Sequence, residues 1–134
     1  MYLLDTNVWL ERLLDQKNSD DVGNLLHQIN TDQLFVTDFS FHSICIILTR
    51  FGHFQTLLDF VQDLFIKGAV NLLSLPPRAM ASLVRAMDEF DLDCDDAYQY
   101  VAAEQNNLVI VSFDHDFDKT SLGRKTPAKV LEQL

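Results

Sequence analysis

The chain has 134 residues, of which 48% are hydrophobic, and its 20 acidic and 10 basic residues give a formal net charge of −10. This length and composition predict one packed domain over residues 1–134 and exclude a disordered chain. The charge has the wrong sign for a protein that binds polyanions over its whole surface, because affinity for phosphates normally comes from Lys and Arg. Four of the ten basic residues nevertheless fall in the last 16 positions, and acids that bind a divalent cation change the sign of the local field.

Two further observations concern the cellular environment. The chain does not open with the apolar segment of a secretory signal, and no apolar run approaches the roughly 18 residues that span a membrane. Cys45 and Cys94 lack the spacing of metal ligands, so we expect both thiols to be reduced. The sequence therefore predicts a cytoplasmic protein without membrane association.

Strand and helix patterns alternate along the chain. The apolar run at residues 2–4 predicts a buried strand, and helical spacing of apolar residues begins at Val8. Thr6 or Asn7 can cap this helix, or Asp5 itself belongs to the cap. Further strands are predicted at 33–37, 69–75 and 108–112, and further helices at 20–29, 41–51, 54–66, 77–90, 93–106 and 127–134. This alternation predicts an α/β fold whose parallel sheet is covered by helices on both faces.

The segment 41–51 is apolar nearly all round, which predicts a helix buried on several sides. Gly52 marks its end, and the helical spacing that resumes at Phe54 predicts a helical hairpin through residue 66.

Acidic residues gather where predicted elements meet. Asp5 follows the first strand, Asp96 lies in the first turn of the helix at 93–106, and Asp114 and Asp116 follow the strand at 108–112. The carboxyl ends of parallel strands share one edge of a sheet, so these side chains can converge if the strands are neighbours. Carboxylates a few Å apart repel by roughly 4 kcal/mol per pair at intermediate dielectric. Such a cluster persists only with protonation or a bound cation, and oxygen ligands suit Mg²⁺ or Mn²⁺.

Three short motifs together resemble the PIN domain, the nuclease fold that includes VapC-type toxins of toxin–antitoxin pairs. They are Leu3-Leu4-Asp5-Thr6-Asn7, Asp96-Ala97, and the run from Ser112 to Phe117. Their order and spacing are about those of the family, and they extend over nearly the whole chain. The resemblance implies a PIN-like three-layer fold with a central parallel sheet of four to five short strands.

The resemblance also implies a metal-dependent ribonuclease that hydrolyses a phosphodiester bond with metal-activated water. The implied cofactor is Mg²⁺ or Mn²⁺, and the implied partners are an RNA substrate, an antitoxin protein and a second copy of the chain. By position, the metal-binding and catalytic acids are Asp5, Asp96 and Asp114, and the supporting residues are Asn7, Ser112, Asp116 and Ser43. For Asp116, the alternative is a loop position that only places Phe117 in the core.

The sequence departs from the family pattern at the second acid. The family usually has a Glu in the helix after the second strand, and that position falls on Ser43. Three interpretations are open. Either Asp38 or His42 partly replaces the missing acid, or Ser43 holds a metal-bound water, or the site has lost a ligand. The corresponding alternative function is a catalytically weak PIN domain that serves as an RNA-binding or protein-interaction module.

A third class, an aspartate-nucleophile phosphatase or a receiver domain, also places an Asp after a first strand. The phosphatase pattern requires a second Asp where Asn7 stands, and a receiver requires an Asp after a middle strand. Dimerisation is common among PIN domains, and the exposed part of the hairpin at 41–66 is a candidate interface, unless all of it faces the core.

Overall fold

The computed structural model describes residues 1–134 and contains a four-stranded sheet and seven α-helices. The strands are β1 (Tyr2–Leu4), β2 (Leu34–Thr37), β3 (Asn71–Leu73) and β4 (Val109–Val111). The α-helices are α1 (Thr6–Leu13), α2 (Ser19–Gln28), α3 (Asp38–Arg50), α4 (Phe54–Val61), α5 (Met80–Phe90), α6 (Cys94–Asn106) and α7 (Pro127–Glu132). Short turns of 3₁₀-helix occupy Thr31–Gln33, Pro77–Ala79 and His115–Lys119, and a π-helical turn at Gln62–Ile66 continues α4.

All strand pairs are parallel, in the order β3-β2-β1-β4. The central strand β1 pairs with β2 through Leu3 and Phe35, and with β4 through Leu4 and Val111. The carboxyl ends of β1 and β4 therefore lie side by side, which confirms the predicted α/β class with four strands.

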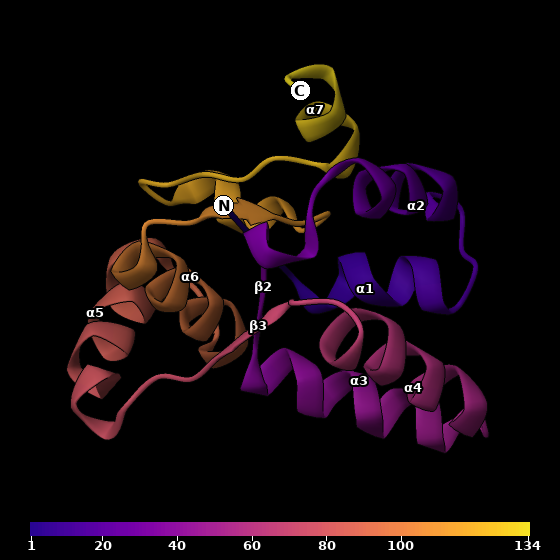
Figure 1. Cartoon of the computed structure of the whole chain (residues 1–134). Coiled ribbons are helices and arrows are strands. Elements are labelled where there is room, and N and C mark those ends of the chain that lie inside the picture. Colours follow the sequence, from indigo (N-terminus) through magenta and orange to yellow (C-terminus); the bar gives the residue numbers. More distant parts are fainter.

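Helices cover both faces of the sheet and form two separate cores. Figure 1 shows α5 and α6 together on one side, and α1 to α4 on the other. Successive residues of a strand point to opposite faces, so Leu3 joins the core beneath α5 and α6 whereas Leu4 joins the core beneath α1 to α4. The result is the predicted three-layer arrangement.

The side chain just before the first residue of a helix caps that helix at three places near the site. Asp5 is the N-cap of α1 and accepts a hydrogen bond from the Thr6 N–H, so of the alternatives for this cap the structure selects Asp5. Thr37 caps α3 by accepting from the Ser40 N–H, and Asp93 caps α6 by accepting from the Asp96 N–H. These capping hydrogen bonds fix the position of Asp5 before α1 and of Asp96 in the first turn of α6.

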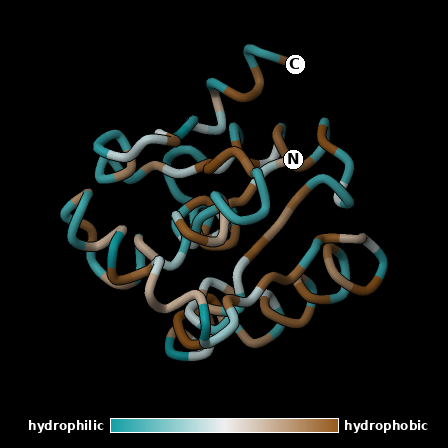
Figure 2. Tube along the Cα trace, turned by 90° about the vertical axis from the view of Figure 1, so that its left-hand side faces the viewer, coloured by the Kyte–Doolittle hydropathy of each residue, from teal (hydrophilic) through white to brown (hydrophobic).

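The prediction that helix 41–51 is buried on several sides is wrong. Only Ser40, Ile44 and Leu48 of α3 are buried, and Ile46 on the same helix is exposed. The helix lies with α4 at the periphery (Figure 1), so it has one inward face. Along the trace, hydrophobic segments run through the interior and hydrophilic residues colour several outer turns (Figure 2). No helix combines the length and apolar character that crossing a membrane requires.

Candidate active site

The predicted site residues Asp5 and Ser112 meet at the carboxyl edge of the sheet. The Asp5 N–H donates to the Val111 carbonyl at 2.9 Å, which continues the pairing of β1 with β4 by one residue. Asp5 and Ser112 are both buried, with exposed fractions of 8% and 0%. The pairing of β1 with β4 therefore determines their proximity, and it makes these two strands the neighbours that the predicted convergence of the acids requires.

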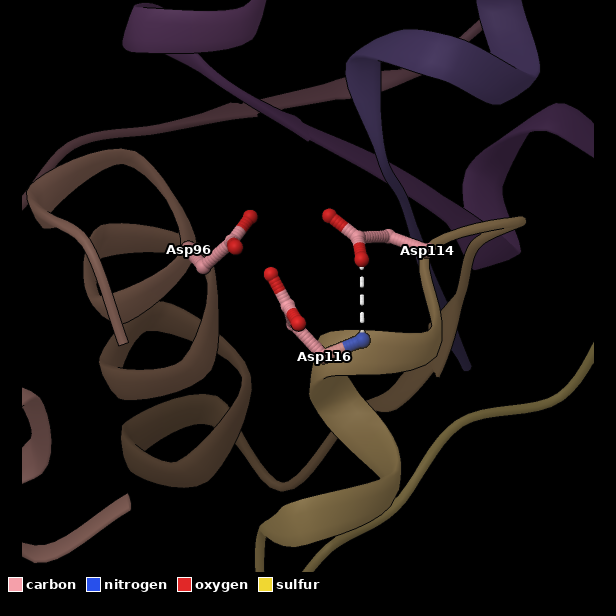
Figure 3. A group of neighbouring side chains, drawn as sticks. All are labelled: Asp96, Asp114 and Asp116. Atoms are coloured by element: carbon pink, nitrogen blue, oxygen red, sulfur yellow. Dashed lines mark hydrogen bonds between the residues drawn. The ribbon is translucent and has the colours of Figure 1, made fainter. Parts of the chain in front are cut away.

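Asp96, Asp114 and Asp116 form the acidic cluster of the site. One carboxylate oxygen from each lies within 4.8 Å of the others. Asp96 comes from the first turn of α6, whereas the other two come from the loop and 3₁₀ turn after β4 (Figure 3). Asp114 Oδ1 accepts from the Asp116 N–H at 2.8 Å, so the turn itself directs the second carboxylate toward α6. Asp5 lies outside this set of three, although its charge raises the pKa of Asp96 and the charge of Asp114 raises the pKa of Asp5.

Asp5 is held by donors from three parts of the chain. Its Oδ1 accepts from the Thr6 N–H at 2.8 Å and from Gln99 Nε2 at 3.0 Å. Its Oδ2 accepts from the Ser112 hydroxyl at 2.7 Å. The Ser112 hydroxyl in turn accepts from the Asp114 N–H at 2.9 Å, which links the two acids through one hydroxyl group.

Asn7 contacts the same loop. Its side-chain oxygen accepts from the Phe113 N–H at 3.3 Å, and its Nδ2 donates to the Ser112 hydroxyl at 3.4 Å. Asn7 thus attaches the start of α1 to the segment that carries Asp114. Phe117 at the far side of the loop is fully buried, and Asp116 beside it is exposed. The loop thus places Phe117 in the core, as one of the two interpretations expected, whereas a ligand role for Asp116 stays a prediction.

Burial and neighbouring charge weaken the acidity of two carboxyls. Burial raises the pKa of Asp96 to about 7, and the charges of Asp114, Asp93, Asp5 and Asp116 add to that effect. Burial also raises the pKa of Asp5, against the hydrogen bonds that favour its ionised form. The cluster is therefore electrostatically strained at neutral pH unless a proton or a cation neutralises part of its charge.

Ser43 lies in the pocket beside these acids, but it supplies no charge there. The pocket has a volume of about 310 Å³, and its walls include Asp5, Asp96, Gln99 and the apolar side chains of α1 and α3. The Ser43 hydroxyl makes no hydrogen bond to any acid. Asp38 and His42 line a different hollow with Phe39 and Tyr98, and Asp38 Oδ1 accepts from the Tyr98 hydroxyl at 2.7 Å. Neither residue lines the pocket that contains Ser43.

Sequence reasoning missed Gln99, a buried amide beside Asp5. It is 2% exposed and bonds to Thr37 of β2, to Ser40 of α3 and to Asp5, which follows β1. One signal was available, because Gln99 follows Asp96 by three residues and thus shares the inward face of α6 with the buried Ala103. A polar residue on an apolar helix face indicates a buried partner.

The side chains fit a hard divalent cation. Every candidate ligand is a carboxylate oxygen, the donor type that suits Mg²⁺ and Mn²⁺, and no Cys or His belongs to the cluster. Ser112 and Asn7 keep the loop that carries Asp114 against the ends of β1 and β4. The site is therefore a group of carboxylates at the carboxyl edge of the sheet in a three-layer α/β domain.

Comparison with known proteins identifies the family. The PIN domain family model matches residues 2–122, and the chain belongs to the PIN domain family. No curated protein sequence matches the chain.

Several solved structures share its fold. FitAcB from Neisseria gonorrhoeae is 18% identical, with a TM-score of 0.79 over 96% of this chain and 99% of the other. A toxin–antitoxin complex from Klebsiella pneumoniae is 15% identical, with a TM-score of 0.76 over 95% and 98% of the two chains. The sarcin-ricin loop cleaving toxin VapC20 from Mycobacterium tuberculosis is 11% identical, with a TM-score of 0.75 over 91% and 96%.

Proposed function

We propose that this chain is a metal-dependent ribonuclease and the toxin of a toxin–antitoxin pair. The observation that carries the proposal is the group of three carboxylates, Asp96, Asp114 and Asp116, whose oxygens lie within 4.8 Å of one another beside Asp5. The family supports a nuclease, and the solved neighbours include toxin–antitoxin assemblies. We also propose that residues 1–134 form one domain and that the protein is cytoplasmic.

In this proposal Asp5, Asp96 and Asp114 hold Mg²⁺ or Mn²⁺, and Asp116 is a further ligand. A divalent cation in such a site lowers the pKa of a bound water and offsets the charge that develops on a phosphate. The chain itself contributes positioning. Ser112 and Asn7 fix the loop that carries Asp114, and the first turn of α6 presents Asp96 to it.

The experiment is cleavage of a mixed set of labelled single-stranded and structured RNAs with Mg²⁺, with Mn²⁺ and with EDTA. We expect cleavage with metal, its loss in EDTA, and its loss in Asp5→Asn. Asp88→Asn is the matched control, because Asp88 is an exposed acid on α5 outside the acidic cluster. Equal cleavage by the parent and by Asp5→Asn contradicts the assignment.

A second candidate function is an RNA-binding or protein-interaction module with little turnover. The observation that favours it is the uncharged α3 wall of the pocket, where Ser43 stands in place of an acid. This candidate predicts RNA binding by the parent that persists in EDTA, without cleavage under any metal condition.

The antitoxin and the second copy of the chain are proposed partners. Support for the antitoxin comes from the neighbour solved as a toxin–antitoxin complex. A small reading frame directly upstream of the gene is the expected source of the antitoxin. Co-expression of that product must relieve any growth arrest that the chain causes in a bacterial host, and failure to relieve it contradicts the pairing.

A further inference from the structure

Gln99 is a buried amide whose hydrogen-bonding groups all have partners. Its Nε2 donates to Asp5 Oδ1 at 3.0 Å and to the Ser40 hydroxyl at 2.7 Å, and its Oε1 accepts from the Thr37 hydroxyl at 2.6 Å. Because Gln99 is only 2% exposed, water does not replace these hydrogen-bond partners. Burying an amide costs free energy unless it is hydrogen-bonded, so this side chain is retained together with its network.

The surroundings determine which way the amide points. In the reverse orientation the Gln99 oxygen would face the Asp5 carboxylate and the Ser40 hydroxyl, and two acceptors would oppose each other at about the distance of the present bond. The Thr37 hydroxyl accepts from the Ser40 N–H at 3.0 Å and is thereby free to donate to Oε1. Both amide N–H groups are consequently directed at Asp5 and Ser40.

The network continues from Ser40 back to the start of α1. The Ser40 hydroxyl accepts a hydrogen bond from the Thr6 hydroxyl at 2.7 Å, and Thr6 is the residue that follows Asp5. Gln99 thus connects the inward face of α6 with the carboxyl ends of β1 and β2. All these groups are neutral, and they occupy the side of Asp5 that faces α3, the helix that carries Ser43 in place of an acid.

We propose that Gln99 is a positioning residue that fixes the orientation of the Asp5 carboxylate. It holds Oδ1 on the α6 side, so that Oδ2 stays directed at Ser112, the hydroxyl that also contacts Asp114. The neutral amide thereby takes the position beside Asp5 without adding a further negative charge. The consequence for metal affinity rests on the proposed function, whereas the orientation of Asp5 does not.

The test compares Gln99→Met with the parent in two measurements. Met retains the length of the side chain and removes every hydrogen bond. We expect the Asp5 side chain to change rotamer or become mobile in the metal-free crystal structure. We also expect the dissociation constant for Mn²⁺, measured by calorimetry, to rise by about 10- to 100-fold, the usual effect of removing a group that orients a ligand.

Asn71→Leu is the matched control for lost stability. The Asn71 amide likewise makes side-chain hydrogen bonds, because its Nδ2 donates to the Asp32 and Leu34 backbone carbonyls, but it contacts none of the acids of the site. We expect this variant to unfold more easily than the parent with unchanged Mn²⁺ affinity. If Gln99→Met fails to fold, Gln99→Leu replaces it, because Leu has similar helix propensity.

The outcomes separate the two proposals. An unchanged Asp5 conformation in the Gln99 variant overturns the positioning role. A reoriented Asp5 in a chain whose parent binds no Mn²⁺ supports the positioning role and contradicts the proposed metal centre. If Gln99→Met and Asn71→Leu change the Mn²⁺ affinity by the same factor, Gln99 contributes only to the stability of the fold, and the inference is overturned.

Discussion

The Ser112 hydroxyl donates a 2.7 Å hydrogen bond to Asp5 Oδ2 across 107 residues of sequence. The bond joins the residue after β4 to the residue after β1, and the same hydroxyl accepts from the Asp114 N–H. The Ser112 side chain therefore hydrogen-bonds to both Asp5 and Asp114, two predicted metal ligands that follow different strands.

Ser112→Ala is expected to leave Asp5 Oδ2 without its donor in a buried setting. We expect a loss of about 1–3 kcal/mol in the free energy of unfolding, as for other buried groups that lose a partner. Metal-stimulated cleavage is expected to fall about 10- to 100-fold. Urea unfolding and RNA cleavage measure the two effects. Thr126→Ala removes the cap of α7 at a cost of about 1 kcal/mol and is expected to leave cleavage unchanged.

Asp116 and Asp118 are two exposed acids of one 3₁₀ turn with different predicted roles. Asp116 belongs to the cluster with Asp96 and Asp114, whereas Asp118 pairs with Arg124 at 3.1 Å. We expect Asp116→Asn to weaken Mn²⁺ binding, because a charged ligand is lost, and Asp118→Asn to leave it unchanged. Calorimetric titration with Mn²⁺ decides the matter. Equal affinities of the two variants would remove Asp116 from the ligand set.

The raised pKa of Asp96 predicts how the stability of the metal-free protein depends on pH. The folded state binds a proton at Asp96 up to a pKa of about 7, whereas the unfolded carboxyl releases it near 3.8. This contribution to stability is complete below pH 3.8 and is lost as the pH rises to 7. Asp96→Asn lacks this titration. We expect the stability of the parent relative to Asp96→Asn to fall by on the order of 2–3 kcal/mol between pH 5 and pH 7.5.

Urea unfolding at the two pH values, with EDTA present, measures that difference. Saturating Mn²⁺ is expected to abolish it, because a cation neutralises the ionised carboxylate. A relative stability that rises with pH would contradict the assigned direction of the pKa shift.

Ser43→Glu places an acid at the position that the resemblance assigns to the Glu of the family pattern. Ser43 lines the pocket of Asp5 and Asp96, so a carboxylate there adds charge to a metal site. We expect the affinity for Mn²⁺ to rise about tenfold, since ligand charge is a main determinant of affinity. The metal-free variant is expected to lose stability at neutral pH through repulsion.

His42→Glu is the control for the added charge. His42 is the preceding residue on α3 but is exposed and lines the other hollow, with Asp38 and Tyr98. We expect no change in Mn²⁺ affinity from this variant. An equal gain from both substitutions would mean that net charge, rather than position 43, determines binding.

The hairpin of α3 and α4 predicts the interface of the proposed homodimer. Phe51, Phe54, Leu58 and Ile66 along it have exposed fractions between 60% and 68%. Placing Asp in such a patch costs free energy only where a partner covers it. We expect Leu58→Asp to shift sedimentation from dimer to monomer, and Val84→Asp, on the equally exposed surface of α5, to have no effect. A parent chain that sediments as a monomer would refute the homodimer.

The sequence predicted the strands and helices and the parallel sheet whose carboxyl edge carries Asp5, because these follow from local pattern. An apolar run that ends in an acid locates Asp5, and parallel neighbours bring the strand ends together. Asp96 was predictable in the same way, as a first-turn residue of a helix that packs beside the sheet.

Other features depend on contacts that the sequence does not encode locally. The three partners of Gln99 come from positions 37, 40 and 5, and their convergence follows only from the packing of α6 against the sheet. The one-sided burial of α3 depends on the place of the hairpin at the edge of the molecule, which a nearly all-apolar helix does not reveal. The direction of the Asp116 carboxylate depends on a 3₁₀ turn shorter than any periodic pattern.

The position of Asp5 at the N-terminus of α1 determines which substitution is informative. Its Oδ1 caps the helix, while Oδ2 accepts from the Ser112 hydroxyl, which follows β4. Ala at this position would remove a cap and a candidate ligand together, so lost activity would have two indistinguishable causes. Asn retains an oxygen for the cap and is as good an N-cap as Asp. A survey of this protein by alanine scanning alone would therefore misattribute its most central residue, and the amide variant separates folding from chemistry.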